Sequence, residues 1–554
     1  MYHMKKATFD GKYISVKFKG HDFSKTKEII KALPLNQRFY RSEDKTWKVH
    51  NTIDNIKYLR KNNFDLSKEL FEQIVPPLTK PWTNIKIPEE FSFLRFYQKE
   101  CLQFLEYHNG RGLLALSPGL GKTVVSLAYF HWKNLFPVLI ICPSITKRQW
   151  EREQLKWFNS NKKIKILNGL ESIQELNEKY DIIVCNYEIL SRHVEKVTIE
   201  KQTELKIDSY LLSFKRNKIK SMVIDECHRI KSDDAKITHA INFLSKGVPY
   251  FLALSGTPMI SRPAELYNVL EIIKPNLFNN KYSYFHRFCD PQLVKTKDRT
   301  IFTFKGSTNA PELSYILKKE VMIRYKKEDI KNLPEKLSII VPLELDNYGE
   351  YRKLSDEINK EIREGNEAAA LTRFEKLKQK TFELKLNQII EWIDEEILKT
   401  SKLLVFGWHR EFLDILYKHY KSKSVKIVGG LSETKKYENV DRFIEEPKIQ
   451  ILFGNIGACG EGLDLLQTVC STVAYVELGW GIKEISQGSG RIWREGQKNF
   501  VLEYFLIGEK TVEQEIMEII DEKQKRSSSV LDGEDIGNDN LLGELYKRYK
   551  KGVK

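Results

Sequence analysis

Two series of short apolar runs, each alternating with amphipathic segments, constrain the fold more than any other feature of the chain. The first series occupies residues 113–116, 138–142, 182–185, 222–224 and 251–254. The second occupies residues 403–406, 425–427, 449–453, 473–476 and 501–505. Continuous apolar runs of this length are typical of parallel strands that helices cover on both faces. The sequence therefore predicts an α/β protein with two lobes, each a parallel sheet between helices.

The length and the remaining segments predict how the chain is divided. A chain of 554 residues is too long for one hydrophobic core. We expect lobe 1 at residues 91–334 and lobe 2 at residues 335–522. Within lobe 2, residues from about 345 to 400 are charged and carry apolar side chains at helix spacing, which predicts antiparallel helices that project from the lobe. A tail at residues 523–554 mixes acids with a basic end and is expected to be loosely ordered.

The N-terminal segment predicts a separate small unit. Residues 13–18 alternate like a half-buried strand and residues 26–33 have helical spacing, so residues 1–75 are expected to form an α+β module. A linker is then expected at residues 76–90, because proline cannot continue a helix and four prolines gather there: Pro76, Pro77, Pro81 and Pro88.

The charge of the chain favours a polyanionic partner. The 91 Lys+Arg and 75 Asp+Glu leave a formal net charge of +16, and each phosphate that a protein neutralises releases condensed counterions. Nucleic acid is the first expectation, and a soluble protein with a lysine-rich surface is the alternative. The seven cysteines are scattered, which predicts reduced thiols in a cytosolic compartment and no zinc site. No apolar run is long enough to predict secretion or a membrane span.

A glycine-rich turn predicts a phosphate-binding loop. It follows an apolar strand and precedes a helix, where backbone N–H groups converge on phosphate oxygens. Gly119 and Gly121 allow the chain to wrap phosphates closely. Lys122 is expected to reach the β- and γ-phosphates, and the Thr123 hydroxyl is expected to coordinate magnesium. Leu116 stands where the general pattern has its first glycine, so a chance turn without function is the alternative.

An acidic pair follows the apolar run at residues 222–224, at the end of a strand where open α/β sheets bind their ligands. Asp225 is expected to hold magnesium, often through water, and Glu226 to polarise the attacking water. A solvated acidic turn is the alternative. Further along, Arg491 and Arg494 are three residues apart and so share a helix face. They could reach the γ-phosphate from the opposite lobe, which predicts one nucleotide site split between two lobes.

Across about residues 92–520 the chain resembles the Swi/Snf-type branch of superfamily-two helicases, with its motifs in the family's order. The resemblance implies two RecA-like lobes, ATP as the nucleotide and Mg²⁺ as its metal. Leu94-Arg-Phe-Tyr-Gln98 resembles the motif in which a glutamine reads adenine, so Gln98 is implied to select ATP. In lobe 2, two further motifs imply that nucleotide is bound by Gly462, Asp464 and Gln487.

The same resemblance implies roles in lobe 1 beyond the nucleotide. Two motifs imply DNA contacts through Pro143, Ser144, Trp150, Asn186 and Tyr187. A third implies that Ser255 and Thr257, together with His228, couple hydrolysis to the rest of the lobe, although His228 could instead be a packed histidine. Three departures indicate that lobe closure is rewired: Ser117-Pro118 replaces an acidic pair, Tyr325 replaces a second arginine, and Gly490 stands where an acid usually precedes Arg491.

The N-terminal module resembles the HARP domain of annealing helicases, through Phe9-Asp-Gly-Lys, Ala32-Leu-Pro34, Phe39-Tyr40 and Lys45-Thr-Trp47. This resemblance implies binding to forked or partly opened DNA, with Trp47 among the contacts. The alternative is a generic small adaptor in which Trp47 fills a core.

Together these features predict an ATP-dependent translocase on double-stranded DNA that remodels forks or anneals opened strands. The alternatives are an RNA-dependent ATPase or helicase, and a nucleotide-gated scaffold that displaces proteins from DNA. We expect double-stranded or forked DNA as partner, single-strand-binding or replication proteins as further candidates, no membrane association and a monomer. A cytoplasmic protein from a bacterial or virus-infected cell is expected, or a nuclear one if the source is eukaryotic.

Overall fold

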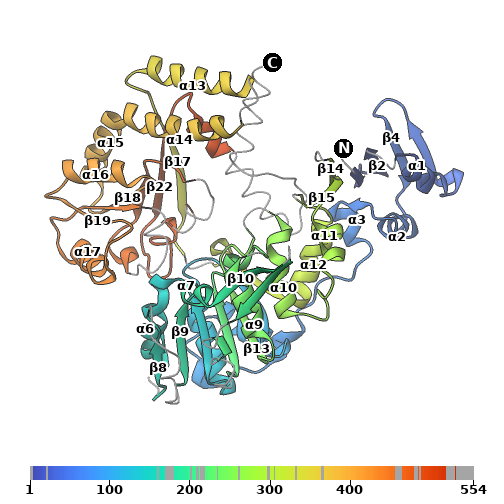
Figure 1. Ribbon diagram of the computed structural model, residues 1–554, viewed down its shortest axis with the longest axis horizontal. Coiled ribbons are helices and arrows are strands. Elements are labelled where there is room, and N and C mark those ends of the chain that lie inside the picture. The colour runs from blue at the N-terminus through green and yellow to red at the C-terminus, as the bar shows by residue number, and fades with distance from the viewer. Residues whose placement is uncertain are drawn as a thin grey trace.

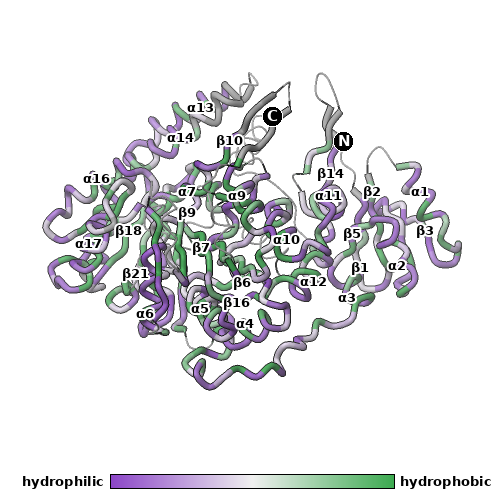
Figure 2. The backbone as a smooth tube through the Cα atoms, turned by 60° about the horizontal axis from the view of Figure 1, so that its bottom comes forward, coloured by the Kyte–Doolittle hydropathy of each residue, from purple (hydrophilic) through white to green (hydrophobic). Residues whose placement is uncertain are grey.

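The fold consists of an N-terminal module and two larger α/β lobes (Figure 1). It comes from a computed structural model that describes residues 4–19, 23–158, 161–168, 180–199, 202–207, 211–212, 219–233, 235–259, 262–295, 300–304, 306–330, 333–363, 367–455, 465–479, 485, 488–518 and 531. Figure 2 shows apolar segments gathered in the central strands and polar segments on outer helices such as α6 and α17.

The module is a five-stranded sheet in the order β3-β4-β2-β1-β5. Its strands are β1 (Met4–Phe9), β2 (Tyr13–Lys19), β3 (Arg38–Arg41), β4 (Thr46–His50) and β5 (Asp65–Leu66). Helices α1 (Phe23–Lys31), α2 (Ile53–Lys61) and α3 (Lys68–Glu72) accompany the sheet. The side chain of Thr52 accepts from the backbone N–H of Asn55 and so caps the start of α2.

Lobe 1 is built on a seven-stranded parallel sheet in the order β16-β6-β13-β12-β7-β9-β8. Its strands are β6 (Arg111–Leu116), β7 (Val138–Cys142), β8 (Ile164–Ile166), β9 (Ile182–Asn186), β12 (Ser221–Asp225), β13 (Tyr250–Leu254) and β16 (Met322–Tyr325). Successive residues of β6 enter different hydrophobic clusters, Leu113 one and Leu114 the other. Both faces of the strand are therefore buried, which explains its continuous apolar run.

The helices of lobe 1 are α4 (Phe96–Tyr107), α5 (Lys122–Lys133), α6 (Lys147–Phe158), α7 (Tyr187–Arg192), α9 (Lys236–Ser245), α10 (Tyr267–Ile273), α11 (Lys281–Phe288) and α12 (Ala310–Glu320). Two antiparallel hairpins are added to the lobe, β10 (Val194–Ile199) with β11 (Gln202–Ile207), and β14 (Pro291–Lys295) with β15 (Thr300–Phe304). The sequence did not predict either hairpin.

Lobe 2 is built on a six-stranded parallel sheet in the order β17-β22-β21-β18-β20-β19. Its strands are β17 (Lys336–Leu343), β18 (Leu403–Gly407), β19 (Ser424–Ile427), β20 (Ile451–Asn455), β21 (Thr472–Tyr475) and β22 (Val501–Gly508). Its helices are α13 (Tyr348–Arg363), α14 (Glu367–Leu384), α15 (Leu386–Lys399), α16 (Arg410–His419) and α17 (Glu433–Glu445). Figure 1 shows α13 and α14 side by side at the outer end of this lobe. The fold class predicted from the sequence is thereby confirmed.

The module is docked on lobe 1 by polar contacts. Glu312 of α12 accepts from Arg60 of α2 at 3.0 Å and from Arg287 of α11 at 2.5 Å. Asp65 of the module accepts from the backbone N–H of Asn309 at 2.7 Å. The intervening segment is also packed, because Trp82 is 5% exposed and its ring lies against Phe104 of α4. The segment predicted to be a linker is thus anchored to lobe 1 at Trp82.

Candidate nucleotide site

The phosphate loop lies between β6 and α5, and its glycines are required by the backbone. Gly119 and Gly121 have φ angles of +89° and +82°, and residues other than glycine adopt such angles only at a cost in conformational energy. A Cβ built at Gly121 would lie 2.5 Å from Nε2 of Gln98. Lys122 is the first residue of α5, and its Nζ donates to the carbonyl of Leu116 at 3.0 Å. Backbone N–H groups at the start of this helix form the expected anion-binding end.

Gln98 connects the segment before α4 to the phosphate loop. It is 6% exposed. Its Oε1 accepts from the backbone N–H of Arg95 at 3.0 Å, and its Nε2 donates to the carbonyl of Leu120 at 3.2 Å. An amide oxygen can accept two hydrogen bonds and an amide nitrogen can donate two, so each end of this fixed side chain can make one more, as reading a base would require.

The acidic pair ends β12 and joins a buried polar network. Glu226 has a φ of +57°, a left-handed conformation that a non-glycine residue rarely adopts. Its Oε2 lies 3.2 Å from Nδ1 of His228 and accepts from Oγ of Ser255 at 3.3 Å. Ser255 also lies 3.2 Å from Nδ1 of His228 and accepts from the backbone N–H of Thr257 at 3.1 Å. The structure thus brings together the residues that the sequence assigned to coupling.

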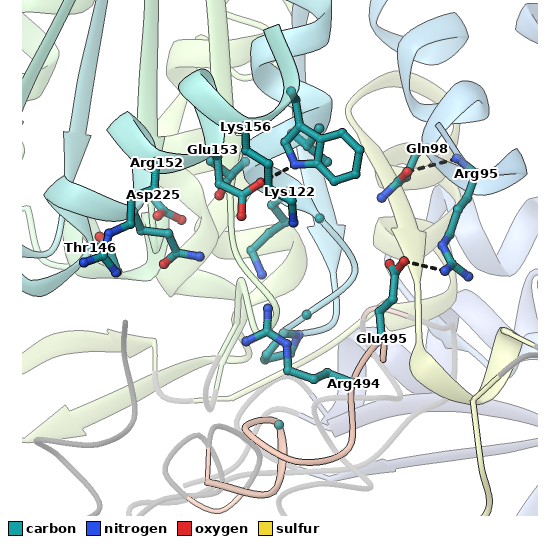
Figure 3. A pocket seen from close by; sticks show the side chains of 18 of the residues that line it. Arg95, Gln98, Lys122, Thr146, Arg152, Glu153, Lys156, Asp225, Arg494 and Glu495 are labelled. Carbon is teal, nitrogen blue, oxygen red and sulfur yellow. Dashed lines mark hydrogen bonds and ion pairs between the residues drawn. The ribbon is translucent and has the colours of Figure 1, made fainter. Parts of the chain in front are cut away.

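Both lobes line one cavity of about 480 Å³ between them. Lobe 1 contributes Gln98, Gly119, Gly121, Lys122, Thr123, Asp225 and Glu226, and lobe 2 contributes Arg491 and Arg494. Figure 3 shows Lys122 and Arg494 pointing into the same space from opposite lobes. Residues separated by about 370 positions in the sequence therefore meet around one cavity, as a split nucleotide site requires.

The donor set of the cavity fits magnesium bound together with a nucleotide. Thr123 offers a hydroxyl and Asp225 a carboxylate, and both line the cavity. Among the described residues we find no cluster of three or more His, Cys, Asp or Glu side chains that could hold a metal by themselves. Mg²⁺ suits such a site, because it is commonly held by one or two protein groups, by water and by the phosphates of its nucleotide.

One of the three departures from the family pattern has a clear side-chain partner in the structure. Tyr325, which replaces an arginine, donates from its Oη to Oε2 of Glu100 at 2.6 Å, and Lys80 pairs with Oε1 of Glu100 at 2.7 Å. Across the lobes, Glu495 pairs with Arg95. Sequence reasoning missed both residues of this pair, although each lies within three positions of a residue assigned to the site.

Of the five residues of lobe 1 that were expected to contact DNA, four are buried in this structure and one is exposed. Trp150 is 2% exposed, and Tyr187 is fully buried at 0% with its Oη bonded to the carbonyl of Asp225. The side chains of Trp150 and Tyr187 therefore pack inside lobe 1. Pro143 is also buried, whereas Ser144 is exposed. Asn186 is 8% exposed and donates to Glu188 at 2.7 Å.

Trp47 of the module packs against the module's hydrophobic core and is at the same time partly exposed. It is half-buried on β4, and its ring lies 5.5 Å from that of Tyr40 and 5.7 Å from the guanidinium of Arg38. Three further expected residues, Gly462, Asp464 and Gln487, lie outside the described residues. The six described cysteines are buried and free, as expected for reduced core thiols. Among the described residues, we find no helix with the length and apolar character that crossing a membrane requires.

The two parallel sheets and the cavity between them define a nucleotide-driven protein of the two-lobe helicase type. Residues 97–391, more than half of the chain, match the SNF2-related domain, and residues 384–496 match the helicase conserved C-terminal domain. The chain therefore belongs to the SNF2-related family. This confirms the resemblance found from the motifs, and with it the prediction of a DNA-dependent ATPase.

The sequence identity between this chain and individual relatives is low. The chain is 28% identical over 527 residues to the SWI/SNF-related matrix-associated actin-dependent regulator of chromatin subfamily A-like protein 1 homolog of Caenorhabditis elegans, covering 90% of this chain and 71% of that protein. It is 26% identical over 451 residues to the human DNA annealing helicase and endonuclease ZRANB3, covering 79% of this chain and 40% of that protein. It therefore spans less than half the length of ZRANB3.

Among solved structures, the chain is similar to the Sulfolobus solfataricus SWI2/SNF2 ATPase core in complex with dsDNA. The two are 22% identical, the match covers 86% of this chain and 99% of the other, and the TM-score is 0.36.

Proposed function

We propose that this chain is an ATP-driven translocase on double-stranded DNA that remodels forks or anneals opened strands. The observation that carries the proposal is the single cavity in which Lys122 and Glu226 of lobe 1 face Arg491 and Arg494 of lobe 2. A site completed only by both lobes makes their closure depend on the bound triphosphate. Hydrolysis then releases the lobes, so each turnover can change the grip on a polymer.

Each side chain of the cavity has one chemical task in this proposal. Lys122 and the backbone at the start of α5 hold the β- and γ-phosphates. Glu226, oriented by Ser255, accepts a proton from the attacking water. Arg491 and Arg494 balance the charge that develops on the γ-phosphate, a contribution of about 10³-fold or more in turnover. Mg²⁺, held by Thr123 and Asp225, would neutralise phosphate charge when bound with the nucleotide.

The DNA part of the proposal rests on charge and on relatives. A net charge of +16 favours phosphate contacts, which carry little sequence preference. ZRANB3 is named a DNA annealing helicase, and the module resembles the HARP domain of such enzymes. On β3 and β4 the module presents Phe39 at 42% exposure, Tyr40 at 51% and the half-buried Trp47, beside Arg38. Exposed rings next to cations suit unpaired bases, which stack on aromatic side chains.

The test compares ATPase rates of the intact protein on single strands, duplex, forks and RNA at equal nucleotide concentration. Stimulation by duplex and more strongly by forks is expected, together with a loss of about 10²-fold or more in Glu226→Gln. Translocation is followed by displacement of a third strand from a triplex. Stimulation by RNA alone would favour the RNA-dependent alternative. Turnover that no nucleic acid stimulates would favour a nucleotide-gated scaffold.

The role of the module is tested in the same assay by the double variant Tyr40→Ala with Trp47→Ala. We expect the fork preference over duplex to fall about threefold or more, because each stacked base contributes roughly 1–3 kcal/mol. Rates on plain duplex should stay within twofold. An unchanged fork preference would leave the duplex motor standing and remove the module from the proposal.

A further inference from the structure

The segment that joins the lobes holds a tryptophan between the two arginines of lobe 2. Trp493 lies between Arg491 and Arg494 in sequence, and its indole Nε1 donates to the carbonyl of Pro334 at 2.8 Å. Two lysines lie against its ring, with Nζ of Lys327 at 5.2 Å and Nζ of Lys336 at 5.0 Å from the centroid. Lys327 also donates to the backbone carbonyl of Trp493. We call Lys327, Pro334, Lys336 and Trp493 the linker clasp.

The linker clasp spans the connection between the two sheets. Lys327 begins a short 3₁₀ helix, which is separated by one residue from β16, the last strand of lobe 1. Lys336 begins β17, an edge strand of lobe 2, and its Nζ pairs with Glu503 of β22 at 2.7 Å. A shift of one lobe against the other must therefore pass through the residues that hold Trp493. The backbone that the clasp holds continues directly into Arg494.

The environment of Lys327 is unusual for a structural lysine. Lys327 is only 4% exposed. The charged groups that act on it most strongly are all cations: Arg494, Lys336, Arg491 and Lys122. Burial, and then this repulsion, hold the pKa of Lys327 well below its ordinary value. An apolar side chain would fill the same space at lower cost. A bound triphosphate is the anion that would balance such a cluster.

We propose that the linker clasp positions Arg491 and Arg494 for the transition state, with Lys327 and Trp493 as positioning residues. Lys327 fixes the carbonyl before Arg494, and Pro334 fixes the indole, so the direction of both arginines is set by the path of the linker. The proposal rests on the proposed ATPase function. It adds that lobe movement reaches the γ-phosphate site through these contacts.

The test compares Lys327→Met with a matched control in the same protein. Lys402 is also a buried lysine, 7% exposed, that donates to backbone carbonyls, of Glu446 at 2.8 Å and of Ile449 at 2.7 Å. Its Nζ lies 5.2 Å from the ring of Phe443, as that of Lys327 lies 5.2 Å from Trp493. Lys402→Met thus removes the same kind of buried contact away from the cavity. Lys327→Arg retains a donor and a charge.

We expect Lys327→Met to lower the kcat of DNA-stimulated hydrolysis about 10- to 100-fold, because a misplacement of about 1 Å can cost 10²-fold. The KM for ATP should change less than threefold. Binding of a fluorescent ADP should stay within twofold, whereas binding of ADP with aluminium fluoride, which mimics the transferring phosphoryl group, should weaken at least tenfold. Lys327→Arg should recover part of the kcat, and Trp493→Phe, which loses the indole donor, should show a smaller loss.

The inference is overturned by an unchanged kcat in Lys327→Met, by a loss confined to KM, or by an equal loss of kcat per folded molecule in Lys402→Met. Failure of the proposed function looks different, because DNA would then not stimulate hydrolysis by the unmodified protein. The aluminium fluoride measurement needs no DNA and would still decide whether Lys327 positions the arginines.

Discussion

Gly119 of the phosphate loop packs directly against Arg494 of the opposite lobe, so that a Cβ built at Gly119 would lie 2.8 Å from Cβ of Arg494. This contact leaves no room for a side chain between the loop and the arginine. Adding one methyl group at Gly119 is therefore expected to change how closely the two lobes approach each other.

Gly119→Ala is therefore expected to lower kcat about tenfold or more, because Arg494 must move away and the left-handed φ of +89° is strained for alanine. Gly247→Ala is the matched control, since Gly247 has a φ of +85° and nothing within 4 Å of its Cβ position. It carries the backbone strain without the contact. Steady-state ATPase assays at saturating DNA measure both. Equal losses in the two variants would show that backbone strain alone is responsible.

The ion pair between Arg95 and Glu495 is expected to make a small contribution to lobe closure. Its side chains are 37% and 51% exposed, and exposed pairs contribute roughly 0.2–1 kcal/mol. Glu495→Ala should raise the KM for ATP about twofold, and less so in high salt because screening weakens exposed pairs. A double-mutant cycle with Arg95→Ala measures the coupling. Glu438→Ala, which breaks an exposed pair with Lys435 within α17, should have no effect.

Ser255→Ala is expected to lower kcat about tenfold while nucleotide binding is kept. The Ser255 side chain is fully buried and holds Glu226, so its loss frees the carboxylate to turn away from the attacking water. Ser221→Ala is the control, because Ser221 is equally buried and bonds the carbonyl of Leu135 at the other end of β12. Stopped-flow hydrolysis and equilibrium nucleotide binding separate the two steps. A weaker nucleotide affinity with unchanged kcat would contradict this role.

His108 is expected to make lobe 1 sensitive to acid. Burial, reinforced by Lys274, lowers the pKa of His108 to about 4 from an ordinary 6.5, and the residue is 7% exposed. Between these values the unfolded chain binds a proton that the folded chain does not, so stability falls as pH falls from about 6.5 toward 4. His108→Phe should remove about 1–2 kcal/mol of the loss between pH 7 and pH 5. Urea unfolding at both pH values measures it, with the exposed His419→Gln as control.

The sequence predicted the buried strands and the phosphate loop well, because both leave local signals. Continuous apolar runs marked β7 and β9, and the glycines marked the turn before α5. It missed β16, whose Arg324 and Tyr325 are only half-buried and interrupt the apolar run. It also predicted β20 from residue 449, whereas the strand begins at Ile451.

The residues of the site were predictable only where family motifs or short-range sequence patterns indicate them. Nothing local indicates that Arg95 meets Glu495 or that Lys327 meets Trp493, because these pairs are 400 and 166 positions apart and depend on how the lobes face each other. The burial of Trp150 and Tyr187 was not predictable either, because side-chain burial follows from packing that a motif does not record.

Glu312 forms ion pairs with both Arg60 of the module and Arg287 of lobe 1. The module is therefore expected to move together with lobe 1. Under the proposed function, lobe 2 shifts during turnover while the module stays with lobe 1, so a DNA junction bound by the module would keep a constant distance from lobe 1. That distance is set by the side-chain contacts between the module and lobe 1, and not by the length of the segment that connects them. Inserting flexible residues between the module and α4 should therefore leave the step length of translocation unchanged, provided that Glu312 keeps its ion pairs with Arg60 and Arg287.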